Sequence, residues 1–190
     1  MKLKTGDRFP EMTFRTAFED NVKTPDILTG MTVFWVLRYI GCPVCRYDIH
    51  DMAAHAAEFT ARGAKIYVVL QSDREHVRQA LQETPVPLEF ICDPEMEFYR
   101  QLEIRPAKNM VALAGNVFRT MAKLNAAKKK GLKHGDYEGD EKQLPALFIV
   151  GPDGTVRYAH YAADLSDMPS AEGVLAILDR LAAEDSSHEN

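Results

Sequence analysis

Hydrophobic residues follow two kinds of pattern along the chain, and each predicts a different element. Thr32–Arg38 and Lys65–Leu70 are continuous runs rich in β-branched and aromatic residues, which is typical of buried strands in a largely parallel sheet. Between these runs, apolar residues recur every three or four positions, which predicts a helix with one buried face that ends near Gly63. That apolar face holds Cys45, Ile49, Met52, Ala53, Ala56 and Phe59. Such a strand, helix and strand form a βαβ unit, whose crossover is right-handed in nearly all proteins.

The same alternation continues toward the C-terminus. The turn sequence Gly-Pro-Asp-Gly at 151–154 separates two short apolar runs and predicts an antiparallel hairpin. A proline in the first turn favours a helix that begins at Pro94. The predicted elements are helices at Asp73–Gln82 and Pro94–Leu102, strands at Leu88–Cys92, Ala146–Val150 and Thr155–His160, and a closing amphipathic helix at Ser170–Ala183. Residues 184–190 are expected to form a frayed tail.

Residues 106–143 interrupt this plan with a helical stripe followed by polar, glycine-bearing sequence. The apolar members of the stripe are Met110, Leu113, Ala114, Val117, Phe118, Met121 and Leu124. Either this helix packs on the surface of its own domain, or its Met and Phe face contacts a second subunit or covers the functional site. Both alternatives stay open, and a homodimer is one expectation.

Composition limits the class of protein. A chain of 190 residues with 46% hydrophobic content can bury one sizeable core, so we expect residues 1–190 to form a single domain. The formal net charge of -5 argues against a nucleic-acid or anionic-membrane partner, because both attract a basic surface. The basic cluster Lys128–Lys130 is short and acidic residues follow it closely, which is typical of the solvated end of a helix.

The N-terminal sequence reaches Gly6 and Pro10 without an apolar stretch, so no secretory leader is expected. The longest apolar run, Met31–Leu37, is far shorter than the roughly 20 residues that span a bilayer. We therefore expect a soluble, cytoplasmic protein. In a reducing cytoplasm, two of three cysteines lying close together indicate catalysis or metal binding rather than a permanent disulfide.

The candidate chemistry lies at Cys42 and Cys45, where a predicted buried strand ends and a helix begins. Proteins of the α/β class place their sites at this edge of the sheet. With Cys42 as the N-cap and Pro43 as the first helical residue, the amides of Val44 and Cys45 point back at the Cys42 sulfur. These donors and the helix dipole favour a thiolate, and cysteine pKa values in such motifs fall from ~8.5 to about 3.5–7.5. Cys42 is therefore the predicted nucleophile, and Cys45 the thiol that resolves an adduct on Cys42.

Two other interpretations of the cysteine pair remain. Zinc sites need about four ligands, and outside the pair the sequence offers a lone Cys92 and two histidines, His50 and His55, that do not share a helical face. Alternatively, both cysteines are simply core residues. Cys92 itself is expected to be a small buried hydrophobic residue. Neither a bound cofactor nor a metal ion is expected.

Several segments, taken in order, resemble the AhpC/TSA family (alkyl hydroperoxide reductase and thiol-specific antioxidant) and its peroxiredoxin-like relatives. Residues 5–14, TGDRFPEMTF, are similar to the family's entry into its first strand. Residues 31–46, MTVFWVLRYIGCPVCR, resemble its central strand and active-site helix, and GCPVCR is closest to the peroxiredoxin-like branch. Residues 68–81, 88–104 and 146–160 are similar to its following strands, helices and hairpin. The resemblance implies an α/β, thioredoxin-like three-layer fold: a central mixed sheet flanked by helices, with a helical insertion before the C-terminal hairpin.

The sequence departs from the family's peroxidases next to the nucleophile. Those proteins carry Pro-x-x-x-Thr-x-x-Cys, in which the proline shields the thiolate and the threonine hydroxyl binds the peroxide. Counting back from Cys42 gives Tyr39 in place of the threonine and Trp35 in place of the proline.

A second departure lies just before the strand at 146–150. The family's active-site arginine is expected there, but this chain has Gln143-Leu144-Pro145. Arg38 or Arg46 is a candidate replacement for its charge, although arginine at either position is also typical of a solvated surface. The thioredoxin fold implies instead that Pro145 is a cis-proline facing the cysteine pair, and an ordinary proline at a strand start is the alternative.

These observations predict a thiol-disulfide oxidoreductase with an antioxidant role, in which the Cys42–Cys45 dithiol reduces peroxides or protein disulfides. A thioredoxin-like or glutathione-dependent reductant would reset the pair. The side chains expected to shape the site are Pro43, Tyr39, Arg46, Leu144 and Pro145. Because the threonine and arginine are missing, we expect slow peroxidase activity at best. The alternative is a non-enzymatic redox sensor or interaction module, in which the disulfide changes how residues 106–143 dock.

Overall fold

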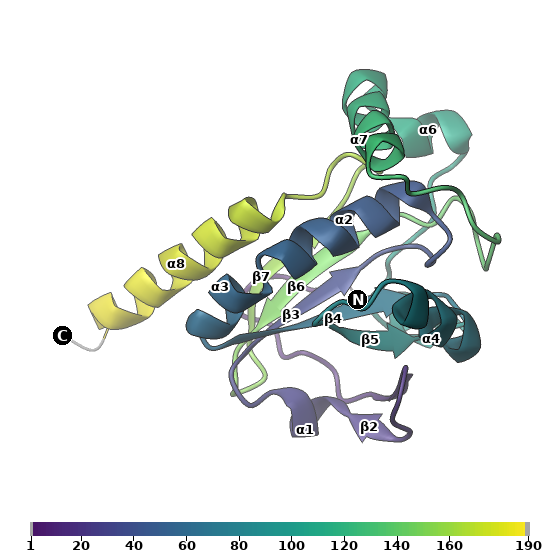
Figure 1. The fold of residues 1–190 in the computed structure, drawn as a ribbon. Helices are drawn as coiled ribbons and strands as arrows, with labels where there is room; N and C mark the ends of the chain where they lie inside the picture. Colours follow the sequence, from purple (N-terminus) through teal and green to yellow (C-terminus); the bar gives the residue numbers. More distant parts are fainter. Residues whose placement is uncertain (1, 189–190) are drawn as a thin grey trace.

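The computed structural model describes residues 2–188, and a seven-stranded sheet lies at the centre of this part of the chain (Figure 1). The strands are β1 Thr13–Thr16, β2 Val22–Lys23, β3 Met31–Val36, β4 Ala64–Leu70, β5 Glu89–Cys92, β6 Ala146–Val150 and β7 Val156–Tyr161. Their order in space is β2-β1-β5-β4-β3-β6-β7. β3, β4 and β5 are mutually parallel, whereas β1 pairs with β5, and β6 with β3 and β7, in antiparallel fashion. The sheet is mixed, as the resemblance implied.

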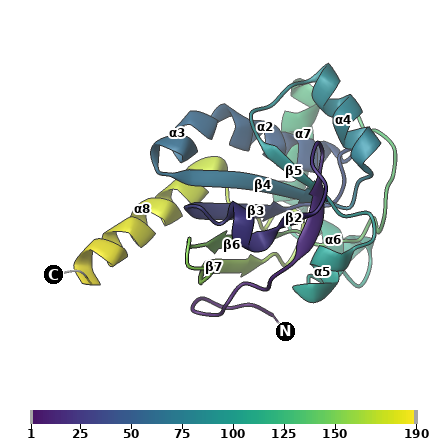
Figure 2. The ribbon, with the colours of Figure 1, turned by 90° about the horizontal axis from the view of Figure 1, so that it is seen from below.

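Helices cover both faces of the sheet and complete three layers. They are α1 Thr24–Ile27, α2 Pro43–Ala54, α3 Ala56–Ala61, α4 Arg74–Glu83, α5 Glu97–Gln101, α6 Met110–Ala114, α7 Val117–Lys129 and α8 Ala171–His188. One face packs against α2, α3, α4 and α8 (Figure 1). The other packs against the N-terminal segment, α1 and α5 (Figure 2). The insertion carries α6 and α7, and α7 packs against α2.

Strand β3 shows how this arrangement supports the cysteine pair. Val33 and Trp35 belong to the core beneath α2, while Phe34 and Val36 belong to the opposite core. Phe34 stacks on Phe9 of the N-terminal segment, with ring centroids 4.7 Å apart. Full burial of such a side chain stabilises the fold by about 1.5–3 kcal/mol. With β4 on one side and β6 on the other, the end of β3 is a rigid platform for the residues that follow.

The predicted strands and the hairpin at 151–154 are confirmed within two residues at each end. The helix predicted after the cysteine pair is instead divided at His55 into α2 and α3. The reason is local: the His55 ring Nδ1 lies 2.9 Å from the Asp51 carbonyl oxygen, the acceptor that a continuous helix would offer to the His55 amide.

The helix predicted to begin at Pro94 begins three residues later. Met96 has a left-handed backbone (φ 59°), and the Asp93 carboxylate accepts hydrogen bonds from the amides of Glu97 and Phe98 at 3.0 and 2.8 Å. Asp93 therefore closes a turn and satisfies the first amides of α5, so the proline belongs to the turn and not to the helix.

The single helical stripe predicted for the insertion is two helices. Gly115 has a left-handed backbone (φ 51°), and a Cβ atom there would collide with the Asp164 side chain, so the chain turns at this glycine. Asn116 then caps α7 by accepting a hydrogen bond from the Arg119 amide at 3.1 Å. The stripe splits accordingly. Leu113 is buried and Leu124 partly buried, whereas Met110, Val117, Phe118 and Met121 are exposed.

The closing helix α8 starts where predicted but continues to His188, so residues 184–188, expected to be frayed, are helical. The Arg157 guanidinium donates to the Asp185 carboxylate and ties the end of this helix to β7. Residues 189–190 of the predicted tail lie outside the described residues. Within residues 2–188, none of the helices combines the length and apolar character that a membrane crossing requires.

Candidate active site

The cysteine pair lies at the start of α2, in the loop that follows β3. Cys42 is the N-cap residue, with an extended backbone (φ -76°, ψ 121°), and Pro43 is the first helical residue. The Cys42 sulfur accepts a hydrogen bond from the Cys45 amide at 3.4 Å. Of the two amides predicted to point at this sulfur, the Cys45 amide does so. The Cys-Pro sequence produces this geometry because the proline lacks the N–H that the first helical position leaves unpaired.

An arginine provides the second donor to Cys42. Arg38 Nη2 donates to Cys42 Sγ at 2.9 Å, and Arg38 Nη1 donates to the Glu141 carbonyl oxygen. Arg38 is buried, which holds its guanidinium against the sulfur instead of in solvent. A guanidinium therefore contacts the sulfur from the loop after β3.

These contacts lower the pKa of the Cys42 thiol to about 5. The largest cause is the hydrogen bond from the Cys45 thiol, and the Arg38 charge and hydrogen bond add to it against the opposing effect of burial. Burial raises the pKa of Cys45, and the neighbouring Cys42 raises it further. Both thiols are free, so the structure describes a reduced pair, and the two pKa shifts favour ionisation of Cys42 before Cys45.

Tyr39 lies close to the cysteine pair. It is buried, its hydroxyl lies 3.2 Å from Nε2 of His134, and the Arg38 guanidinium lies over its ring, 5.1 Å from the centroid. The tyrosine at the family's threonine position thus contacts the arginine that holds Cys42. Burial raises the pKa of its hydroxyl, which keeps it protonated.

Residues 131–143, called here the cover segment, lie over the start of α2. The Gly135 amide donates to the Gly41 carbonyl at 2.9 Å, and a Cβ atom on Gly41 would collide with the Asp136 carbonyl oxygen. Glu138 accepts hydrogen bonds from the Asp73 amide and the His76 ring, at 2.9 and 2.8 Å. Under this cover the exposed fraction of Cys42 is 0%.

The other predicted site residues lie apart from the pair. Arg46, on α2, lines a surface hollow of about 180 Å³ with Gly41 and His76. Leu144 packs in a separate small cluster around Leu113. Pro145 precedes β6 with a trans peptide bond, and its carbonyl accepts a hydrogen bond from the Ala162 amide at 3.1 Å. The expectation of a cis-proline is wrong, and Pro145 is an ordinary proline at a strand start.

Arg38 was considered from the sequence as a replacement for the family's arginine, but it was not among the side chains expected to shape the site. Its position four residues before Cys42, directly after a buried strand, was a usable signal, because the chain has little freedom between a strand end and the helix it feeds. Its burial could not be read from the sequence, since it depends on the Glu141 carbonyl about a hundred residues later.

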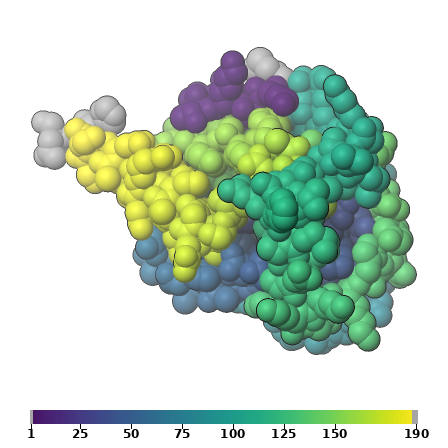
Figure 3. Space-filling model, turned by 90° about the horizontal axis from the view of Figure 1, so that it is seen from above, coloured from purple at the N-terminus to yellow at the C-terminus, as the bar shows by residue number. Residues whose placement is uncertain are grey.

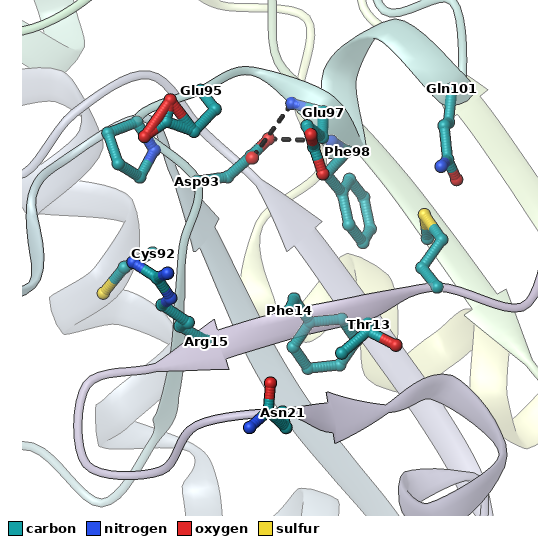
Figure 4. Close-up of a pocket in the computed structure, with 12 residues that line it drawn as sticks. Thr13, Phe14, Arg15, Asn21, Cys92, Asp93, Glu95, Glu97, Phe98 and Gln101 are labelled. Atoms are coloured by element: carbon teal, nitrogen blue, oxygen red, sulfur yellow. Dashed lines mark hydrogen bonds between the residues drawn. The ribbon is translucent and has the colours of Figure 1, made fainter.

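Cys92 lies at the end of β5, away from the pair, and is buried as predicted. Burial raises its pKa to about 12. It lines a cavity of about 290 Å³ between β1 and the start of α5, in which Arg15 lies near Cys92, and Asp93 and Phe98 lie further along (Figure 4). A thiol this hard to ionise is a poor nucleophile. Within residues 2–188, no group of three or more His, Cys, Asp or Glu side chains is placed to hold a metal ion.

The model of the AhpC/TSA family matches residues 5–159. Among curated proteins, Peroxiredoxin-like 2C of Bos taurus and of Homo sapiens are each 22% identical to this chain over 149 residues, which is 75% of the chain. The matches cover 65% of the bovine and 66% of the human protein, so the chain spans slightly less than two thirds of these relatives.

Solved structures share the arrangement of elements at low identity. A yeast mitochondrial 1-Cys peroxiredoxin has a TM-score of 0.72 at 15% identity, over 97% of this chain and 78% of that one. For Xanthomonas campestris peroxiredoxin Q the TM-score is 0.65 at 16% identity, over 89% and 90%. A peroxiredoxin-like protein from Aquifex aeolicus gives 0.67 at 15% identity, over 95% and 89%. These similarities concern the fold, and they agree with a thioredoxin-like arrangement of the described residues.

Proposed function

Because this chain belongs to the AhpC/TSA family, we propose that it is a thiol-dependent oxidoreductase in which Cys42 attacks an oxidised substrate and Cys45 closes a disulfide. The observation that carries the proposal is the pair of donors on Cys42 Sγ, the Cys45 amide and the Arg38 guanidinium. Both donors hold negative charge on the sulfur at neutral pH, and the thiolate is the nucleophilic form of cysteine.

The first step depends on the oxidant. With a peroxide, the Cys42 sulfur bonds to one oxygen, the O–O bond breaks, and the leaving alkoxide or hydroxide takes up a proton, so Cys42 becomes a sulfenic acid. With a disulfide, the thiolate displaces one sulfur as a thiolate and leaves a mixed disulfide on Cys42. In either case the negative charge leaves Cys42, and Arg38 is placed to stabilise that charge where it starts.

The second step belongs to Cys45. Burial raises its pKa in the reduced protein, and the negative charge of Cys42 raises it further. Once Cys42 carries an adduct, that charge is gone while the Arg38 charge remains, so Cys45 releases its proton more easily. Its sulfur then bonds to Cys42, with loss of water from the sulfenic acid or of the substrate thiol. A thioredoxin-like or glutathione-dependent donor returns two electrons and two protons to the pair.

Of the two groups that the family's peroxidases place beside the nucleophile, the site has an arginine but not the threonine. Arg38 supplies a guanidinium at the sulfur, although the family's usual position for it holds Gln143-Leu144-Pro145. Tyr39 stands where the peroxide-binding threonine would be, and its hydroxyl faces His134. We therefore propose that this protein reduces peroxides slowly and disulfides more readily.

Access to Cys42 requires movement of the cover segment. The sulfur has no exposed surface, and neither cysteine lines any of the five main cavities found in the described residues. The cover segment is held beside the pair by the contact between Gly135 and Gly41 and the contact between Glu141 and Arg38, and we propose that substrate binding displaces one of them.

The test is to oxidise the reduced protein separately with hydrogen peroxide, an organic hydroperoxide and a protein disulfide, and to follow each cysteine by mass spectrometry. We expect a Cys42–Cys45 disulfide in the wild-type chain. In Cys45→Ser we expect a trapped intermediate on Cys42, a sulfenic acid with peroxides and a mixed disulfide with the protein. The matched control is Cys92→Ser, which should react like the wild type. Modification that avoids Cys42, or fast oxidation by peroxide alone, would contradict the corresponding part of the proposal.

A further inference from the structure

Positive charge is concentrated in one part of the chain. Residues 104–135 contain eight lysines and arginines and no aspartate or glutamate. The whole chain has 23 basic and 28 acidic residues, so the remainder carries 15 basic against 28 acidic. The net charge of -5 therefore hides two regions of opposite sign, and the basic region is the insertion that packs on α2.

Four lysines form the exposed end of this region, and we call them the basic face: Lys128, Lys129, Lys130 and Lys133. Of the acidic residues that follow them in sequence, Glu138 and Asp140 are engaged elsewhere. Glu138 bonds to the Asp73 amide and His76, and the Asp140 carboxylate accepts from the Lys142 amide. Among the described residues, no carboxylate lies within ion-pair distance of the basic face. Sequence proximity to acids therefore does not neutralise the basic face, although Lys128–Lys130 are exposed at the end of α7, as expected for a solvated helix end.

The basic face adjoins the helix that carries the cysteine pair. Lys130 Nζ lies 5.8 Å from the centroid of the Tyr47 ring, two residues after Cys45. Burial lowers the pKa of His50, and the charges of Arg46 and Lys130 lower it further, so both cations act on this histidine of α2. The hollow that Arg46 lines also contains Glu83 and Asp136, so the surface next to Arg46 is acidic. Figure 3 shows α6 and α7, in teal to green, as a ridge on the side of the molecule that holds α2.

A structural role explains only part of this arrangement. Cations in the last turn of a helix interact favourably with its dipole, worth about 0.3–1 kcal/mol each at the surface. Lys128 and Lys129 lie in the last turn of α7, but Lys133 lies beyond it and Arg46 on another helix. Gathering like charges there costs energy, and a partner of opposite charge removes that cost.

We propose that the basic face docks an acidic dithiol protein that reduces the Cys42–Cys45 disulfide. This inference rests on the proposed function, because that function creates the disulfide. A symmetric dimer through this face is disfavoured, since two basic faces repel. A small anionic thiol is disfavoured because no described cavity is lined by either cysteine. An acidic protein surface gains both orientation and a faster encounter from the lysines.

The electron balance of the docked reaction is complete. One thiolate of the partner attacks the Cys42 sulfur, the Cys42–Cys45 bond breaks, and Cys45 leaves as a thiolate that takes up a proton. The partner's second thiol then attacks the mixed disulfide and releases Cys42 as a thiolate. Two electrons pass to the pair, and the partner departs with its own disulfide.

The experiment starts from full-length protein whose Cys42–Cys45 disulfide has been verified by mass spectrometry. Failure to form this disulfide would count against the proposed function and not against the docking surface. Reduction is then timed with uncharged dithiothreitol, with glutathione, and with a reduced thioredoxin of net negative charge. The variants are Lys128→Glu/Lys129→Glu/Lys130→Glu and the corresponding triple glutamine variant. The matched control, Lys4→Glu/Lys23→Glu/Lys65→Glu, makes the same change of charge at exposed lysines elsewhere.

We expect reduction by the acidic thioredoxin to slow about tenfold at low salt in the glutamate variant, less in the glutamine variant, and about twofold or less in the control. The difference should shrink as salt rises from about 50 to 300 mM, because screening weakens the attraction. Rates with dithiothreitol should be equal in all variants. Equal rates with thioredoxin, or an equal loss in the control, would overturn the proposal. Two other results in the glutamate variant would also overturn it, if the rate with thioredoxin were unchanged. One is slower reduction by glutathione, and the other is weaker binding to phosphatidylserine vesicles.

Discussion

At the scale of single residues, the chemistry depends on the contacts that Cys45 and Arg38 make with one sulfur. The contact from the Cys45 amide is local, and the Cys-Pro-x-Cys sequence after a buried strand was sufficient to predict it. The contact from Arg38 is not local, because the guanidinium is held by a carbonyl of the cover segment. Arg46 has the same side chain one residue after Cys45, yet it points to a different hollow. Sequence alone could not decide between the two arginines.

Replacing Arg38 should raise the pKa of Cys42. Arg38→Met keeps much of the side-chain volume but removes the charge and the hydrogen bond to the sulfur, so the midpoint of a pH titration of Cys42 alkylation should move up from about 5 by a unit or more. The rate of disulfide reduction at pH 6 should fall with it, because less thiolate is present.

Arg46→Met is the matched control for this change, since it removes an arginine near the cysteine pair for which no contact with the Cys42 sulfur is seen. Its midpoint should equal that of the wild type. An unchanged midpoint in Arg38→Met, or equal shifts in both variants, would show that the Arg38 contact does not set the thiolate.

At the scale of elements, the strands and the βαβ unit were predictable because their signals are continuous apolar runs. The breaks in the helices were not, because each arises from one side chain or one backbone angle. His55 diverts a carbonyl from α2, and Gly115 turns the chain between α6 and α7. The pairing of the insertion with the active-site helix was also hidden, since it joins residues far apart in sequence.

That pairing includes a buried ion pair between α2 and α7. Lys123 Nζ lies 2.9 and 3.1 Å from the two carboxylate oxygens of Asp48. Burial raises the pKa of Asp48 to about 6, although the Lys123 charge opposes this. Lys123→Met should leave a buried carboxylate without its partner and destabilise the protein by about 3–5 kcal/mol at pH 8.

The loss should be smaller at pH 5, where Asp48 can take up a proton instead of remaining charged. Denaturant unfolding at the two pH values measures the difference. Lys129→Met, at an exposed position of the same helix, should change stability by no more than about 0.5 kcal/mol. A cost in Lys123→Met that did not depend on pH would argue against a charged Asp48.

The cover segment can be opened by one methyl group. In Gly41→Ala the new Cβ atom meets the Asp136 carbonyl oxygen, a backbone atom that can yield only if the segment moves. We expect faster alkylation of Cys42 at a pH where it is fully ionised, and faster proteolysis within residues 131–143. Gly173→Ala is the comparison, because its Cβ would approach nothing closer than 3.2 Å. Unchanged alkylation in Gly41→Ala would mean that the segment does not limit access.

At the scale of the whole molecule, the order of strands brings the site together. β3 lies inside the sheet between β4 and β6, so the loop after it emerges beneath both α2 and the cover segment. The family resemblance was enough to predict this architecture. It could not predict the departures within it, namely the trans Pro145 and the guanidinium that enters from Arg38.

The ionised sulfur also makes overall stability depend on pH. The folded pKa of Cys42, about 5, lies below its ordinary value near 8.5. A group whose pKa is lowered by folding stabilises the native state above its unfolded pKa, and that contribution is lost as pH falls toward the folded pKa. The stability of reduced wild type relative to Cys42→Ser should therefore rise between about pH 5 and 8.5, by at most about 1.4 kcal/mol per pH unit. A flat difference across this range would mean that Cys42 is not ionised in the native state.

The complete enclosure of Cys42 matters for how such a protein is found. Surveys that rank reactive cysteines by how quickly they capture an electrophilic probe in native extracts will rank this residue low, since a reagent reaches a sulfur with no exposed surface only while the structure around it is open. The same enclosure spares the thiolate from indiscriminate modification while the protein is idle. Its full reactivity is expected with a molecule that displaces residues 131–143, so a macromolecular oxidant is a better bait than a small reporter.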